Sequence, residues 1–316
     1  MNENSYSDAE ALDLLEQLEH ILEFDSLMKL IMSKKQLLPM FMDELRMSAL
    51  VLSYSPKSER AWSHRRWVIT MISGKCSTLQ RIIEKESELV ENIAEKSKMN
   101  YRAWNHRCWL VSYMTSEQVL HELKKSRNWS GLHVADNSCF HYRQKLILSN
   151  LEDLCQMQEN DYSGCNIEIH RGWKEELDWN KALIKRYVGR EALWLHRRFL
   201  ALYWIRHTTT GHLSVSSQSK QKTGVDTDIN SFMDHELFLV DSCSTIPDDD
   251  FEDFQAQAIH SATYMLWLTR QIPKSCRIAI QEKLRAGELT RLLRKTCPER
   301  CSLWDYLADS HCEGEN

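Results

Sequence analysis

Apolar residues recur at steps of three and four along most of the chain, the spacing that places them on one face of an α-helix. Residues 7–31 open with a capping-box sequence at Ser7 and carry Leu12, Leu15, Leu18 and Leu22 at this spacing. A second helix is predicted to begin with Pro39 in its first turn and to end just before Tyr54. Further amphipathic helices are predicted over 78–95, 115–125, 175–187, 230–242, 248–271 and 276–296.

Two segments lack this spacing. Residues 156–172 have only weak periodicity, so we expect an irregular insertion there. Residues 206–229 are rich in Thr, Ser, Gln and Lys and contain few large apolar side chains, too few to offset the entropy lost on ordering. We expect a disordered linker or loop over 206–229.

One short motif recurs within the helical pattern: an aromatic residue, two spacers and an arginine, followed by an apolar run. Its copies are Trp62 with Arg65, Trp104 with Arg107, Phe140 with Arg143, and Trp194 with Arg197. Recurrence at intervals of tens of residues indicates a repeat protein. A fainter copy without the arginine occurs at 302–307, where a chance match is an equal alternative.

The spacing of the motif suggests a structural role. Residues three apart on a helix share a face, so the ring and the arginine point the same way. We expect the ring to be buried between helices and the arginine to bond carbonyls or carboxylates of the adjoining helix. Histidines beside the motif invite a catalytic or metal-binding interpretation, but no helix pairs them at ligand spacing, which disfavours it for His64, His106, His141 and His196.

These patterns predict an all-α fold, an α–α superhelix (solenoid) of antiparallel helical hairpins. The helical repeat array is expected over 1–205, the linker over 206–229, and helices that complete the array over 230–316. Within the array the repeats are expected near 57–70, 99–112, 136–149 and 190–203.

Composition and charge exclude two classes of function, nucleic-acid binding and membrane insertion. With only 9 Gly and 5 Pro in 316 residues, the chain has few helix breakers. A formal net charge of -5 gives no drive toward nucleic acid. No apolar run reaches the roughly 20 residues of a membrane span, and no signal-peptide pattern opens the sequence. We therefore expect neither nucleic-acid binding nor membrane insertion, and a cytoplasmic location.

The cysteines offer one weak candidate for a metal site, made of Cys297, Cys301, His311 and Cys312. Because the stretch between Cys301 and Cys312 has the pattern of a helix, reduced thiols are favoured over a structural zinc. No phosphate-binding glycine loop, nucleophile elbow or zinc-protease motif is present. We expect no metal and no cofactor in this chain.

Residues 56–66 and 100–107 resemble the repeat of protein prenyltransferase α subunits, with its pattern Asn-Tyr-x-x-Trp-x-x-Arg. The resemblance covers about 35–205 and starts one repeat late, which predicts an open N-terminal end of the array. It implies an α-like subunit of a heterodimeric enzyme, most closely a protein geranylgeranyltransferase. Such an enzyme is active only with a β subunit that holds zinc, an isoprenoid diphosphate and the C-terminal cysteine of a protein substrate.

The resemblance also implies site residues. Lys57 takes the place of a lysine that steadies the leaving diphosphate, and Asn100, Tyr101 and Arg102 take places near that group. The sequence departs from the family where Ser58-Glu59 replaces Asn-Tyr, so a solvated lysine at a helix start is the alternative for Lys57. The alternative for the whole chain is a non-enzymatic helical-repeat adaptor that binds a protein partner.

Overall fold

The computed structural model describes residues 34–74, 76–157, 162–210, 222–244, 252–272, 291, 293–295 and 298–303. Within these ranges the chain is made of helices and turns, with no strand. The all-α class is therefore confirmed. The chain forms two compact units, Met1–His106 and Arg107–Asn316.

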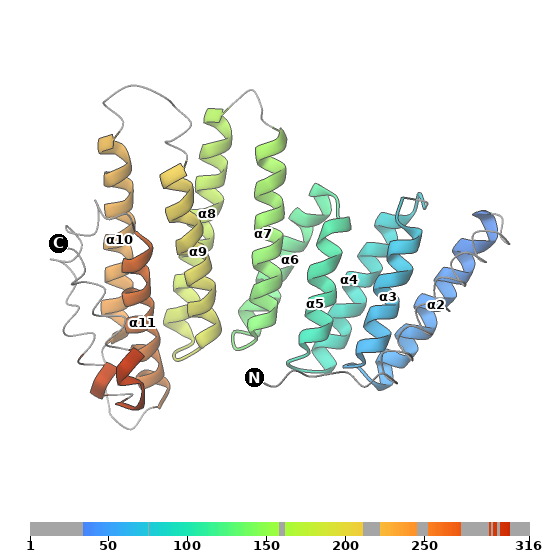
Figure 1. The fold of residues 1–316 in the computed structure, drawn as a ribbon, viewed down its shortest axis with the longest axis horizontal. Helices are drawn as coiled ribbons and strands as arrows, with labels where there is room; N and C mark the ends of the chain where they lie inside the picture. The colour runs from blue at the N-terminus through green and yellow to red at the C-terminus, as the bar shows by residue number, and fades with distance from the viewer. Residues whose placement is uncertain are drawn as a thin grey trace, which may run out of the picture. The chain divides into compact units, whose positions relative to one another are not determined.

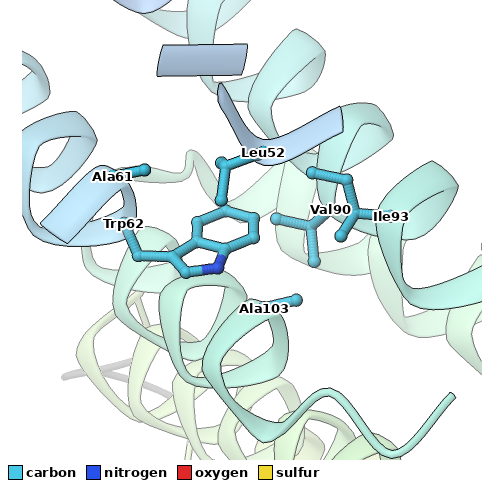
Figure 2. Close-up of a cluster of buried hydrophobic side chains, with 6 residues drawn as sticks. All are labelled: Leu52, Ala61, Trp62, Val90, Ile93 and Ala103. Carbon is cyan, nitrogen blue, oxygen red and sulfur yellow. The ribbon is translucent and has the colours of Figure 1, made fainter. Parts of the chain in front are cut away.

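The first unit is built from α2 (Lys34–Tyr54), α3 (Glu59–Ile72), α4 (Leu79–Lys96) and the start of α5 (Tyr101–Leu110). The indole ring of Trp62 is fully buried at its centre. Figure 2 shows this ring surrounded by Leu52 of α2, Val90 and Ile93 of α4, and Ala103 of α5. One tryptophan thus supplies apolar surface to all the helices around it, which explains the large ring at this position.

The second unit repeats the same pairing. Its elements are η1 (Val111–Tyr113), α6 (Ser116–Leu132), α7 (Asn137–Met157), α8 (Tyr162–Arg186), α9 (Glu191–Thr210), α10 (Lys222–Ser244), α11 (Glu252–Gln271) and η2 (Pro298–Arg300). Neighbouring helices pair as α6 with α7, α8 with α9, and α10 with α11. Within this unit α7, α9 and α11 follow one another side by side (Figure 1). Antiparallel helical hairpins, the predicted building block, are thus present.

Local signals fix where the helices begin. Ser58 caps α3 by accepting a hydrogen bond from the amide of Ala61. Thr115 and Gln118 form a capping box at the start of α6, each side chain bonding the other residue's amide. These side chains satisfy amides that the first turn of a helix leaves without a partner. The start predicted at residue 115 is confirmed for α6.

Three sequence-based expectations were wrong. Pro39 lies inside α2 and not in its first turn, because that helix begins at Lys34, five residues earlier than predicted. Proline has no N–H, so it removes one hydrogen bond of the helix, at an exposed position. Residues 162–172 belong to α8; the segment contains no proline to interrupt a helix that later packing stabilises. The linker expected over 206–229 is helical at both ends, since α9 continues to Thr210 and α10 starts at Lys222.

Several other expectations fall outside the described residues. These are the helix over 7–31, most of the helix over 276–296, the middle of the 206–229 linker, and most of the faint motif copy at 302–307. Among the helices that are described, none combines the length and the apolar character that crossing a membrane requires.

Candidate functional site

The motif arginines are buried and bond to the helices on either side. In the first unit, Arg65 donates to both carboxylate oxygens of Glu86 on α4, with 3.0 Å from Nε to Oε2. Its Nη1 also donates to the Ser48 hydroxyl at 2.8 Å and to the Leu45 carbonyl on α2. A single guanidinium on α3 therefore joins three helices.

The second unit repeats this arrangement. Arg143 donates to both oxygens of Glu176 at 2.6 Å, to the Leu123 carbonyl at 2.7 Å and to the Ser126 hydroxyl at 3.0 Å. Arg107 donates to Glu122. Arg197 donates to Glu236 and to the Leu177 carbonyl. The arginines are structural struts whose donors already have partners, so none is offered to a ligand.

Each of these glutamates has a second partner, which for Glu86, Glu122 and Glu176 is the residue two places after the next motif aromatic. Glu86 contacts Nε2 of His106 at 3.2 Å, and Glu176 contacts Nε2 of His196 at 3.0 Å. At the other two glutamates a tyrosine hydroxyl takes the place of the imidazole. Tyr142 donates to Glu122 at 2.6 Å, and Tyr264 donates to Glu236 at 2.7 Å. We call the resulting set of an arginine, a glutamate and a histidine or tyrosine the relay.

Burial and pairing together set the charges in the relay. Burial favours the neutral form of Glu176, but hydrogen bonds from Arg143 and His196 outweigh it and lower the pKa of Glu176 to about 2. The same balance lowers the pKa of Glu86. Burial lowers the pKa of His106 and His196, so each imidazole is neutral and donates its Nε2 proton to the carboxylate. The relay is a set of satisfied buried pairs and not a proton-transfer site.

The residues expected near a diphosphate lie at the edge of the first unit. Lys57 is exposed in the turn between α2 and α3. Asn100 is buried, with 1% of its surface exposed. Its amide donates to the Pro56 carbonyl at 2.8 Å, and its oxygen accepts from the amide of Ala103 at 3.2 Å. Asn100 therefore clamps the Lys57 turn against the start of α5, and both ends of its side chain are engaged.

Tyr101 and Arg102 remain at the surface of this edge. Tyr101 is 58% exposed, and the Arg102 guanidinium lies 4.9 Å from the centre of its ring. Nε of Arg102 donates to Glu59 at 3.0 Å, and Arg66 donates to the other oxygen of Glu59 at 2.9 Å. The hydrogen bond from Arg66, aided by Arg102, lowers the pKa of Glu59, which stays ionised. An anion at this edge would have to compete with Glu59 for Arg102.

The relay glutamates were missed by the sequence analysis, although a local signal marks two of them, Glu122 and Glu176. A Glu-Leu pair occurs 20 residues before the histidine or tyrosine at Glu44, Glu122 and Glu176, with the partners His64, Tyr142 and His196. The alternation of His and Tyr hides this pattern. It also hides a further repeat in α10 and α11, where Tyr264 and Glu236 play the same parts without a following arginine.

Nothing in the described part of the chain resembles a metal centre: no three His, Cys, Asp or Glu side chains gather there. Burial raises the pKa of the Cys108 and Cys139 thiols to about 12, so neither is a nucleophile at neutral pH. Of the weak candidate cluster only Cys301 is described, and it is a free thiol. Cys297, His311 and Cys312 lie outside the described residues.

The family model described as "Protein prenyltransferase alpha subunit repeat" matches residues 41–72, 83–114 and 173–204. Each matched segment pairs a glutamate-bearing helix with the motif helix that follows it, as in α2 with α3, α4 with α5, and α8 with α9. Each matched repeat therefore includes the helix before the motif helix, whereas the repeats expected near 57–70, 99–112 and 190–203 cover the motif helices alone. Arg65 of the first matched segment binds Glu86 of the second, so the relay links these two repeats.

Similar proteins carry this family's name. The chain is 30% identical over 224 residues to protein prenyltransferase alpha subunit repeat-containing protein 1 of Homo sapiens, covering 58% of this chain and 54% of that protein. It is 31% identical over 220 residues to the Danio rerio protein of that name, covering 58% and 52%. Protein 1-B of Xenopus laevis is 26% identical over 196 residues, covering 49% and 46%. The chain thus spans about half the length of these relatives.

Proposed function

Because the chain carries protein prenyltransferase alpha subunit repeats, we propose that it is the α-like subunit of a protein prenyltransferase heterodimer, of the geranylgeranyltransferase type, acting in the cytoplasm. Its partner is a β subunit. The complex transfers an isoprenoid from its diphosphate to the C-terminal cysteine of a protein substrate. The observation that carries the proposal is the exposed Lys57 on the matched repeats, next to Pro56, whose carbonyl accepts a hydrogen bond from Asn100 at the start of α5.

In this proposal the β subunit provides the metal. Zinc bound there would favour the thiolate of the substrate cysteine. This chain would act on the leaving group instead: the Lys57 ammonium would attract the diphosphate as negative charge develops on it. The Arg102 fork can hold two phosphate oxygens once it releases Glu59. Asn100 would act as a positioning residue, because it fixes the carbonyl of Pro56 next to Lys57.

Co-expression with each type of prenyltransferase β subunit, followed by co-purification and a lipid-transfer assay, tests this proposal. We expect one β subunit to co-purify and to transfer lipid. Lys57→Ala should slow transfer by about tenfold or more, the effect of removing one electrostatic contact to the leaving group, and leave the complex intact. Lys85→Ala removes an equally exposed lysine from the outer face of α4 and should change neither measurement. Failure of every β subunit to bind would overturn the proposal.

One observation favours a second candidate, a non-enzymatic adaptor that binds a protein partner. Glu59 stands at the edge where the family places a polar pair, and it occupies Arg102 and Arg66 with its own charge. An acid here repels a diphosphate. A complex with a β subunit that transfers no lipid, in the chain as it stands and in Glu59→Gln, would favour the adaptor. Recovery of transfer in Glu59→Gln would favour the enzyme subunit.

A further inference from the structure

Arg198 on α9 is a charged side chain that makes no hydrogen bond within the described part of the chain. Its Nε is buried, while the rest of the residue is half-buried. The central carbon of its guanidinium lies 5.6 Å from the centre of the Trp267 ring on α11. A guanidinium does not lose its proton in a protein, so a positive charge and a buried donor are left without an acceptor.

The equivalent arginine of the first matched repeat has the partners that Arg198 lacks. Arg66 donates to Glu59 at 2.9 Å and to the Ser63 hydroxyl at 3.0 Å. The first and third matched segments place Arg198 at the position of Arg66, and Leu195 at the position of Ser63. An apolar side chain thus stands where a hydroxyl acceptor would be.

The carboxylate of this position is also not bonded to the arginine. Glu191 takes the place of Glu59 in the third matched segment, but it is exposed and forms no ion pair with Arg198 among the described contacts. Its charge is still felt, because it opposes the effect of burial on the pKa of Arg198 and of His260. Arg198 therefore has an acid in its vicinity and a free set of donors.

Two further donors lie beside Arg198 on α11, which neighbours α9 (Figure 1). His260 and Trp267 are seven residues apart, two turns of the helix, and share one face. Neither ring has a hydrogen-bonding partner among the described residues. Burial, together with the charge of Arg198, lowers the pKa of His260, so its imidazole is neutral and carries one N–H. We call Arg198, His260 and Trp267 the donor cluster.

We propose that the donor cluster is a binding site for a carboxylate of a peptide ligand. The planar fork of Arg198 matches the two oxygens of a carboxylate. One positive charge, a neutral imidazole and the nearby acid Glu191 suit a single negative charge better than the double charge of a phosphate. Leu195, which is 38% exposed on the same helix, offers apolar contact to the chain that carries the carboxylate.

The carboxylate can come from an acidic side chain or from the C-terminus of the peptide, since both present the same two oxygens. The inference does not rest on the proposed function, whose residues Lys57, Asn100, Tyr101 and Arg102 belong to the first unit. A failure of either one therefore leaves the other standing.

Fluorine NMR tests the proposal on the full chain labelled with fluorotryptophan. Trp267→Phe removes one resonance and so identifies Trp267 among the 11 tryptophans. At constant ionic strength we would add a neutral acetylated peptide with a free C-terminus, an acetylated and amidated peptide with one glutamate, and the glutamine counterpart of the latter. We expect one or both carboxylate peptides to shift the Trp267 resonance, which also identifies the source of the carboxylate. No shift with either, an equal shift with the glutamine peptide, or a shift with inorganic phosphate alone would overturn the proposal.

Three variants test the role of the donor cluster in the same titration. Arg198→Gln should weaken binding by about tenfold or more, the effect of losing a hydrogen bond to a charged group. Arg66→Gln removes the partnered equivalent and should leave the Kd unchanged. Glu191→Gln removes the competing acid and should tighten binding by about two- to fivefold, a gain that a damaged fold cannot produce. Unchanged affinity in Arg198→Gln, or weaker binding in Glu191→Gln, would contradict the site.

Discussion

Arg65 and His106 bind the same carboxylate from different helices: both contact Glu86, which is buried between them. The guanidinium carries the charge that balances the carboxylate, and the neutral imidazole adds a hydrogen bond. Neither contact is accessible to a ligand. The repeated motif that looked most like chemistry is therefore the part of the molecule that holds neighbouring repeats together.

Removing the shared carboxylate should be costly. In Glu86→Ala the charge of Arg65 stays buried without its partner, and we expect the free energy of unfolding to fall by about 3–5 kcal/mol. Glu88→Ala, two residues along and exposed on α4, should change it by less than about 0.5 kcal/mol. Urea denaturation followed by circular dichroism measures both. Similar losses in the two variants would contradict the role assigned to Glu86.

Stability should also fall in acid because of Glu176. Its pKa is about 2 in the folded chain, below its usual value of 4.5. A depressed folded-state pKa contributes stability above the unfolded-state pKa, and that contribution is lost as the pH falls through the folded value. We expect it to be complete above about pH 4.5 and to disappear toward pH 2. Denaturant unfolding across this range should show a shallower loss for Glu176→Gln than for the unaltered chain; equal slopes would refute the assignment.

Gly189 should not tolerate a side chain. Its φ is +75°, and a Cβ atom built there would lie 2.7 Å from the carbonyl oxygen of Asp253 at the start of α11. Gly189→Ala is therefore expected to destabilise the second unit by more than about 1 kcal/mol. Gly172, inside α8, has open space around its Cβ position, and Gly172→Ala should stabilise by about 0.5–1 kcal/mol. In thermal unfolding, we expect the midpoint temperature to fall for Gly189→Ala and to rise for Gly172→Ala.

Met99 lies in the corresponding turn of the first unit. It precedes Trp104 by five residues, just as Gly189 precedes Trp194 by five residues. Within the described ranges it is the single non-glycine residue with positive φ, at 56°. Met99→Gly removes strain of about 1–2 kcal/mol but adds entropy to the unfolded chain, so we expect stability to stay level or rise by up to about 1 kcal/mol. Lys98→Gly, its exposed neighbour, has no such strain to relieve and should lose stability. Equal losses of stability in Met99→Gly and Lys98→Gly would contradict the strain assigned to Met99.

The sequence predicted those features that one helix determines by itself. The common face of Trp62 and Arg65 follows from a three-residue step, and the helix start at residue 115 from the local apolar spacing. The carboxylate that each arginine binds was not predictable in this way. The partners are separated by sequence stretches of unequal length, 21 residues from Arg65 to Glu86 and 39 from Arg197 to Glu236.

The contacts around Lys57 were also only partly predictable from the sequence. The resemblance placed Asn100 to Arg102 near Lys57, and the structure brings the two loops together through the Pro56 carbonyl. The sequence did not show that Asn100 is fully engaged in that contact or that Glu59 occupies Arg102. Both facts depend on side chains of the α3 and α5 starts meeting in space, which no spacing along one helix encodes.

The relay also affects the cooperativity with which each unit unfolds. Within each unit, a glutamate on one helix is held by an arginine from the preceding motif helix and by a histidine or tyrosine from the helix that follows the glutamate in its own repeat. If one repeat opened alone, its neighbour would keep a buried ion without a counter-ion, at a penalty of several kcal/mol. Partial opening is thereby made unfavourable, and each unit should unfold as a single cooperative block and not fray repeat by repeat.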